Sequence, residues 1–359
     1  MSEHRKRIYG LDILKTFSIQ FVILYHAGVL SSCLGLNLEP LSRFVVPCFF
    51  MITGFFFCST VNRGKEYVQI RKILVLILVS NAILILLNVI NNLYKGINNI
   101  DWFLSLFSFK KLFNFLVFNS YIVTGHFESY HLWYLNSLLS VLLIAAICRK
   151  LGIFKLLYYL TPVLLAGGLI VECFSERIFG VNFAENHGLC YYRNFLTIGL
   201  PYFCIGNLLN TYWRRIKINT LLLLILFVLL LGASFIERKI SIQLSLSSNG
   251  EFYLSTPFYS VFIFLFFYKY YLGKNLNKFE KALAVTGKKY VIWIYIFHLP
   301  IIVIVRDLFS IIGTPNVNNF IVTVITIILS LILAVVIDKT TSLMKGQMNR
   351  NSISGEGNN

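Results

Sequence analysis

Apolar residues fall in blocks of about twenty along most of this chain, and this spacing constrains the fold more than any other feature. A helix of about 20 apolar residues crosses the roughly 30 Å hydrocarbon core of a bilayer. Of the 359 residues, 57% are hydrophobic and 13% are charged, whereas about a quarter of the residues in soluble domains are charged. We therefore predict an all-α fold, a polytopic bundle of transmembrane helices.

The blocks predict about ten membrane spans. Loops on the cytoplasmic side of a membrane carry an excess of Lys and Arg. With the N-terminus placed inside, most of the 32 Lys and Arg residues fall at cytoplasmic ends of the spans. This bias predicts an even number of spans, with both termini cytoplasmic. The expected spans are residues 9–30, 44–61, 72–93, 131–149, 154–172, 192–211, 219–236, 253–272, 290–310 and 319–338.

The chain is expected to hold one membrane domain, residues 1–338, followed by a polar tail, residues 339–359. The tail ends in "GQMNRNSISGEGNN", and its Gly, Asn and Ser content predicts disorder. The longest loop, about residues 94–130, contains "WFLSLFSFKKLFNFLVF", which we expect to lie in the membrane interface rather than to cross it. Membrane topology accounts for the net charge of +17, so we expect lipid and no nucleic acid as a partner.

Cysteine spacing gives no sign of a metal site, and we expect no metal. Cys173 and Cys190 flank an expected outer loop, where they either pair in a disulfide or stay reduced.

The first expected span carries three ionisable residues, Asp12, Lys15 and His26. At about 100° per residue all three share one narrow helix face, and His26 lies about 16 Å beyond Lys15 along the axis. Lys15 follows Asp12 by three positions, within reach of an ion pair. Such groups face a polar cavity or a partner when they lie inside a membrane. The stripe is therefore either a polar path from the cytosolic side or a set of helix-to-helix contacts and interfacial anchors.

Four stretches of the chain carry a further signal. "GLDILK" (10–15) is followed, after ten residues, by His26, and "VPCFFMITGFFF" (46–57), "HLWYL" (131–135) and "WIYIFHLP" (293–300) come later in order. Together they resemble motifs of the acyltransferase-3 family of integral membrane O-acyltransferases. One departure is "QIRKIL" (69–74), which stands where the family often has an Arg-x-x-Arg pair.

The resemblance implies transfer of an acyl group, acetyl in the first instance, from cytosolic acetyl-CoA to a hydroxyl of a cell-surface or lipid-linked glycan. His26 is then the expected base, because imidazole titrates near neutrality. Lys15 would orient the donor or attract its phosphates, with Asp12 holding Lys15 in place. Arg71 and Lys72 would either meet the CoA phosphates or serve as positive-inside anchors.

Other matched residues have two interpretations each. Tyr295 and His298, in a late span, either line the same cavity as His26 or bond across helices. His131 and Trp133, at the outer mouth of the fourth span, suit either carbohydrate contact or anchoring in the interface.

The mechanism stays open between deprotonation of the acceptor in a ternary complex and an acyl group carried by His26. Because the chain ends soon after the last span, we expect no appended extracytoplasmic domain of the SGNH esterase type. A transporter or flippase of glycans or lipids is the alternative. Internal repeats in the sequence would favour that alternative, but the sequence contains none. A receptor or scaffold would normally bring a signalling domain.

Overall fold

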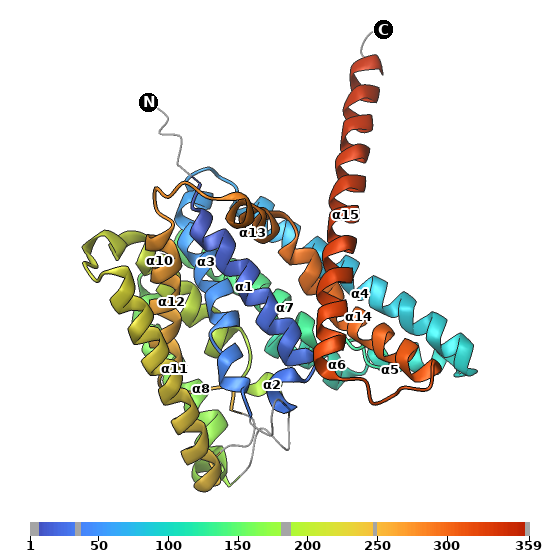
Figure 1. Cartoon of the computed structure of the whole chain (residues 1–359), viewed down its shortest axis with the longest axis horizontal. Coiled ribbons are helices and arrows are strands. Elements are labelled where there is room, and N and C mark those ends of the chain that lie inside the picture. The colour runs from blue at the N-terminus through green and yellow to red at the C-terminus, as the bar shows by residue number, and fades with distance from the viewer. Residues whose placement is uncertain (1–6, 33–36, 181–187, 247–249, 356–359) are drawn as a thin grey trace. The chain divides into compact units, whose positions relative to one another are not determined.

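The computed structural model describes residues 7–32, 37–180, 188–246 and 250–355 (Figure 1). The described residues form helices and no strand, as the all-α prediction requires. The chain divides into two compact units, one formed by residues 1–29 and 273–359 and the other by residues 30–272. We call them the terminal unit and the central unit.

The terminal unit brings the two ends of the chain together. Helix α1 of this unit packs against α13, α14 and α15, and α14 packs along α15. Its helices are α1 (Tyr9–His26), α13 (Lys278–Lys289), α14 (Val291–Ile311) and α15 (Asn319–Gly355).

The central unit holds most of the other helices. Its most extensive packing contacts join α3 to α10, α11 to α12 and α8 to α10, and α4 also packs against α7. A short helix, α2 (Val29–Ser32), stands at the boundary of the two units. The α-helices of the central unit are α3 (Val45–Val61), α4 (Glu66–Lys95), α5 (Asn99–Leu106), α6 (Phe109–Phe118), α7 (Trp133–Lys150), α8 (Leu156–Phe179), α10 (Leu200–Tyr212), α11 (Thr220–Gln243) and α12 (Thr256–Tyr270). Its shorter helices are η2 (Glu39–Ser42), η3 (Tyr130–Leu132), η4 (Leu189–Tyr191), the π-helix η5 (Phe195–Gly199) and η6 (Trp213–Arg215).

Seven helical segments within the described residues are long and apolar enough to cross a membrane. Three further helices, α1, α10 and α12, stand where the sequence analysis expected spans, but they have only 18, 13 and 15 residues. The number of ten spans and the cytoplasmic side of the termini therefore stay predictions. The seven segments are Glu39–Val61, Glu66–Lys95, Tyr130–Lys150, Leu156–Ile178, Thr220–Gln243, Val291–Ile311 and Asn319–Leu343.

The core of the terminal unit lies between the end of α1, α14 and α15. Ala27 is fully buried beside Ile302, Val305 and Val322. Helix α14 is apolar on most sides, as a helix buried all round is, and nearly every residue of its middle, from Ile294 to Ile302, is buried.

Small residues let α3 and α10 approach each other closely in the central unit. A Cβ at Gly54 would collide with the carbonyl group of Phe203, and one at Gly206 would collide with the backbone of Met51. The amide of Asn207 donates to the carbonyl oxygen of Gly54 at 2.9 Å. Small residues and such polar bonds are the usual means by which helices associate in a membrane.

Two segments test the remaining expectations about the fold. The expected interfacial stretch forms two helices, α5 and α6, which are too short to span. Helix α15 continues to Gly355, where the sequence predicted a disordered tail from residue 339. The hydroxyls of Thr340, Thr341 and Ser342 donate to carbonyl oxygens of the preceding turn, which satisfies these polar side chains within the helix. The last four residues lie outside the described part of the chain.

Candidate active site

A cluster of charges occupies the first turns of α1. Asp12 accepts from Lys15 Nζ at 2.9 Å and from Arg7 Nε at 3.0 Å, so one carboxylate serves two cations. The Asp12–Lys15 ion pair is the contact that the three-residue spacing predicts. Arg7 is the additional member, and from the sequence it counted only as one of the Lys and Arg residues at cytoplasmic ends of the expected spans. Its guanidinium also lies 4.8 Å from the centre of the Tyr9 ring.

Helix α13 holds this end of α1 in place. Thr16 Oγ1 donates to the carbonyl oxygen of Leu283 at 2.7 Å, and Arg7 donates to that of Ala284 at 2.8 Å. Gly287 lies against the Asp12 backbone, where an added Cβ would collide with the Asp12 carbonyl oxygen. The charge cluster therefore sits on a tightly packed helix pair.

At the other end of α1, His26 lies beside His298 of α14. Their ring centroids are 5.2 Å apart, and the ring planes are tilted by 44°. His298 is fully buried, and His26 is partly exposed. The sequence allowed His298 either to share a site with His26 or to bond across helices, and the structure brings the two rings together.

The tautomer of His298 follows from its contact with Tyr295. His298 Nδ1 lies 2.7 Å from the carbonyl oxygen of Tyr295. A carbonyl oxygen only accepts hydrogen bonds, so Nδ1 donates its proton to it and the lone pair of a neutral ring is on Nε2. The Tyr295 ring lies 6.0 Å from the His298 ring, so the motif "YIFH" contributes an orienting carbonyl as well as an imidazole.

The end of α1 that carries His26 is fixed from α14 and α15. Arg306 donates to the carbonyl oxygen of Ala27 at 3.0 Å and to Asn319 Oδ1 at 3.2 Å. Asn319 in turn donates to the carbonyl oxygen of Gly28 at 3.2 Å. A cation at a helix C-terminus also interacts favourably with the helix dipole. These contacts limit the movement of His26. The sequence did not predict a role for either Arg306 or Asn319.

The remaining predicted site residues belong to the central unit. Arg71 and Lys72 are exposed near the start of α4. His131 is buried in η3, 2% exposed. Trp133, at the first position of α7, lines a cavity of about 440 Å³. The structure therefore gathers Asp12 with Lys15, and His26 with His298 and Tyr295, in the terminal unit.

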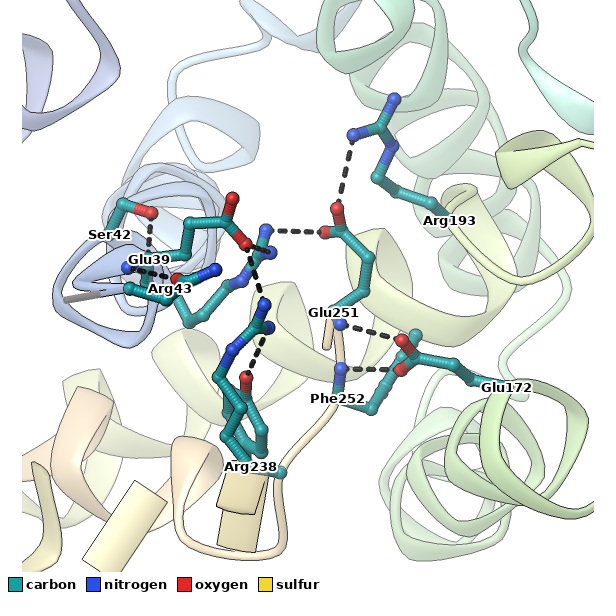
Figure 2. Close-up of polar contacts among 10 residues, drawn as sticks. Glu39, Ser42, Arg43, Glu172, Arg193, Arg238, Glu251 and Phe252 are labelled. Carbon is teal, nitrogen blue, oxygen red and sulfur yellow. Dashed lines mark hydrogen bonds and ion pairs between the residues drawn. The ribbon is translucent and has the colours of Figure 1, made fainter. Parts of the chain in front are cut away.

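A second charged cluster lies in the central unit (Figure 2). Arg43 pairs with Glu251 at 3.0 Å and with Glu39 at 3.5 Å, and Arg193 pairs with the other oxygen of Glu251 at 3.4 Å. Arg238 pairs with Glu39 at 3.5 Å. No sequence pattern predicted this cluster. Its one sign was that these three arginines fall at expected outer ends of spans, where the positive-inside rule predicts few cations.

Glu172 ties the same loop to α8. Its two carboxylate oxygens accept from the backbone N–H groups of Glu251, at 2.7 Å, and Phe252, at 2.6 Å (Figure 2). Such bonds to a charged acceptor are stronger than those between neutral groups. The cluster therefore fixes the position of Glu251 between two arginines.

The described residues include no group of three or more His, Cys, Asp or Glu side chains placed to hold a metal ion. Cys173 and Cys190, for which the sequence left pairing open, are free thiols in the structure.

Comparison with known proteins identifies the type of chain. The family model described as an acyltransferase domain, of the acyltransferase-3 type, matches residues 8–339. The chain is also 23% identical, over 321 residues, to an amino-acid racemase of Enterococcus faecalis. That match covers 85% of this chain but 42% of the racemase, so the chain spans less than half the length of this relative. No solved structure matches the chain. With its several apolar helices and a family match over most of its length, this multi-pass membrane protein belongs to the acyltransferase-3 family.

Proposed function

We propose that the chain is an O-acyltransferase that moves an acyl group, acetyl in the first instance, from cytosolic acyl-CoA to a hydroxyl of a cell-surface or lipid-linked glycan. It would act in the cytoplasmic membrane of a bacterium, in polysaccharide biosynthesis. The observation that carries the proposal is the pair of imidazoles, His26 and His298, whose ring centroids lie 5.2 Å apart. The match to the acyltransferase domain supports the transfer of an acyl group.

Acyl transfer to a hydroxyl needs a base for the hydroxyl proton, and a histidine is suited to this at neutral pH. His26 is the more accessible of the two imidazoles, so we assign it the proton transfer. His298, held by the Tyr295 carbonyl oxygen with its lone pair on Nε2, orients the reacting groups. The same arrangement serves a ternary complex or an acyl group carried by His26.

The charge cluster on α1 fits the anionic part of acyl-CoA. Arg7 and Lys15 share the single carboxylate of Asp12, so the three side chains keep a net positive charge. Arg and Lys at such a place bind phosphate through charge-assisted hydrogen bonds. The bound acyl-CoA would supply the thioester, while Lys15 and Arg7 hold its phosphates and Asp12 keeps both cations in position. Arg71 and Lys72, exposed on α4, are further phosphate-binding candidates.

Labelled acetyl-CoA tests this function. Membranes that contain the chain are incubated with acetyl-labelled CoA, and the glycan and lipid fractions are extracted. We expect label in the saccharide-containing fraction, released by mild alkali as an ester is. A transporter or flippase would move saccharide across the membrane without incorporation of label, and that result would contradict the proposal.

A further inference from the structure

The cavity of about 440 Å³ in the central unit lies outside the histidine pair. Its walls come from α6, the segment 119–130, the start of α7 and the segment 188–193. Small-molecule sites in proteins usually have volumes of about 300–1,000 Å³. The cavity is therefore large enough for a sugar residue and its substituents.

The chemistry of the walls is polar and aromatic. Tyr121, Tyr130 and Trp133 supply ring faces, whereas Leu189 is the single aliphatic side chain among the described residues that line the cavity. Aromatic rings that carry a polar group, set among amides and hydroxyls, suit a sugar, whose ring has apolar C–H faces and polar edges.

A layer of hydrogen bonds behind the wall keeps it rigid. Asn119 is buried, and its amide donates to Ser140 Oγ at 2.9 Å. Its carbonyl oxygen accepts from the backbone N–H of Phe195 at 3.1 Å and from Ser137 Oγ at 3.2 Å. The carbonyl oxygen of Ser120 accepts from Asn136 at 3.0 Å. A wall held in this way is largely preformed, which lowers the entropic cost of binding.

Two cations face the cavity from different elements. Lys111 of α6 donates to Thr124 Oγ1 at 3.1 Å. The Arg193 guanidinium lies 5.2 Å from the centre of the Trp133 ring and 3.4 Å from Glu251 Oε1. Glu251 is paired more closely with Arg43, at 3.0 Å, so it neutralises Arg193 only in part. Among the described lining residues Glu128 is the one carboxylate, which leaves the cavity with an excess of positive charge.

We propose that this cavity binds the acceptor, and that the acceptor is a saccharide with an anionic group that Lys111 and Arg193 bind while its sugar ring stacks on Trp133. The role of the bound saccharide as the acceptor rests on the proposed acyl transfer, whereas the binding of an anionic saccharide in the cavity does not. The anionic group is a uronate carboxylate or a sugar phosphate, since both present oxygens that a guanidinium and an ammonium bind.

The test measures binding to the purified full-length chain in lipid nanodiscs, without any acyl donor. The probes are D-glucuronic acid and D-glucose 1-phosphate, with neutral D-glucose as the reference, titrated by calorimetry or followed by saturation-transfer NMR. We expect the better anionic probe to bind about tenfold more tightly than glucose, as a charge-assisted bond adds. The identity of the better probe distinguishes a uronate from a phosphate.

Variants locate the effect. Arg193→Gln and Lys111→Gln should each remove most of the preference for the anionic probe, whereas Trp133→Ala should weaken all three probes by about fivefold. Arg149→Gln, at the exposed far end of α7, is the matched control and should bind as the wild type does. If Arg193→Gln fails to fold because Glu251 loses a partner, Lys111→Gln carries the test from another element.

Equal binding of neutral and anionic probes to the wild type would overturn the proposal, as would an unchanged preference in both Gln variants. The outcome is separable from that of the acyl-transfer assay. An anion preference without label transfer would leave this site standing and remove the proposed function, whereas label transfer without an anion preference would do the reverse.

Discussion

His26 and His298 lie with their ring centroids 5.2 Å apart, although they stand near opposite ends of the chain. Helices α1 and α14 pack within the terminal unit, and this packing makes the pair. The Tyr295 carbonyl oxygen holds the ring of His298. The Arg306 guanidinium holds the end of α1, the helix that carries His26. The pair is therefore positioned from both sides, as acid–base chemistry requires.

His298→Gln should lower the turnover number for acetyl transfer at least tenfold and change the KM for acetyl-CoA little. Glutamine keeps a polar group near the Tyr295 carbonyl oxygen but lacks the Nε2 acceptor of the imidazole ring, with which His298 orients the reacting groups. Steady-state kinetics on nanodisc-embedded protein, with the thermal midpoint as a folding control, checks this. A wild-type turnover number in the folded variant would assign His298 to packing alone.

Arg306→Gln should reduce turnover by about three- to tenfold, because the end of α1 loses its charged hydrogen-bond donor and His26 shifts. A misplacement of 1 Å can cost about 100-fold in rate, and we expect a smaller shift here. Arg306→Lys keeps one donor for the Ala27 carbonyl oxygen and should restore part of the rate. Lys339→Gln, an exposed cation of α15, is the control. An Arg306→Lys variant no better than Arg306→Gln would argue against positioning by this bond.

Gly287→Ala should destabilise the chain by about 1–3 kcal/mol, because the new methyl group meets the Asp12 carbonyl oxygen and forces α13 away from α1. Gly232→Ala is the matched control, since the space around Gly232 of α11 is open. That substitution should stabilise the helix by about 0.5–1 kcal/mol. Thermal unfolding in detergent compares the two, and equal midpoints would mean that α13 moves without cost.

The sequence could predict the helices and the contacts within one helix. Apolar blocks fix where long helices form, and the spacing of Asp12 and Lys15 fixes their ion pair, because both features are local. The contact of Arg7 with Asp12 and that of Thr16 with Leu283 of α13 depend on how the folded chain packs, so no periodic pattern in the sequence predicts them. The same holds for Arg306, which reaches α1 only in the folded chain.

The cluster around Arg43 was hidden for a further reason. Arg43 and Glu251 lie far apart in the sequence, in short connecting segments that carry no periodic pattern. Only the excess of arginine at expected outer positions hinted that these cations have partners. The polar tail is a separate case, because composition describes only an average tendency to disorder, whereas the hydroxyls of Thr340 and Thr341 bond within the last turns of α15.

Anion binding in the cavity should strengthen as the pH falls. Burial raises the pKa of the Glu128 carboxyl above its ordinary value of 4.5. As the pH falls through this raised pKa, Glu128 becomes neutral, and the cavity loses the negative charge that lines it beside Lys111 and Arg193. Tyr121 stays neutral, because burial and the nearby Glu128 raise its pKa, and burial likewise raises the pKa of the Cys190 thiol. The cavity therefore becomes more positive.

Calorimetric titration with D-glucose 1-phosphate across the acid range measures this effect, after correction for the ionisation of the probe. Near neutral pH, Glu128→Gln should bind the probe more tightly than the wild type does. Its affinity, once corrected for ionisation of the probe, should no longer depend on pH. A variant with the same corrected pH profile as the wild type would remove Glu128 from the account.

The most direct test of the central claim compares the wild type with His26→Ala in the transfer of label from acetyl-CoA to extracted glycan. The account predicts a loss of about 10²- to 10⁴-fold, the usual contribution of a general base. Equal amounts of folded protein in the membrane must be shown for both. If His26→Ala transfers label as fast as the wild type, His26 is a structural residue and the histidine pair is not the active site.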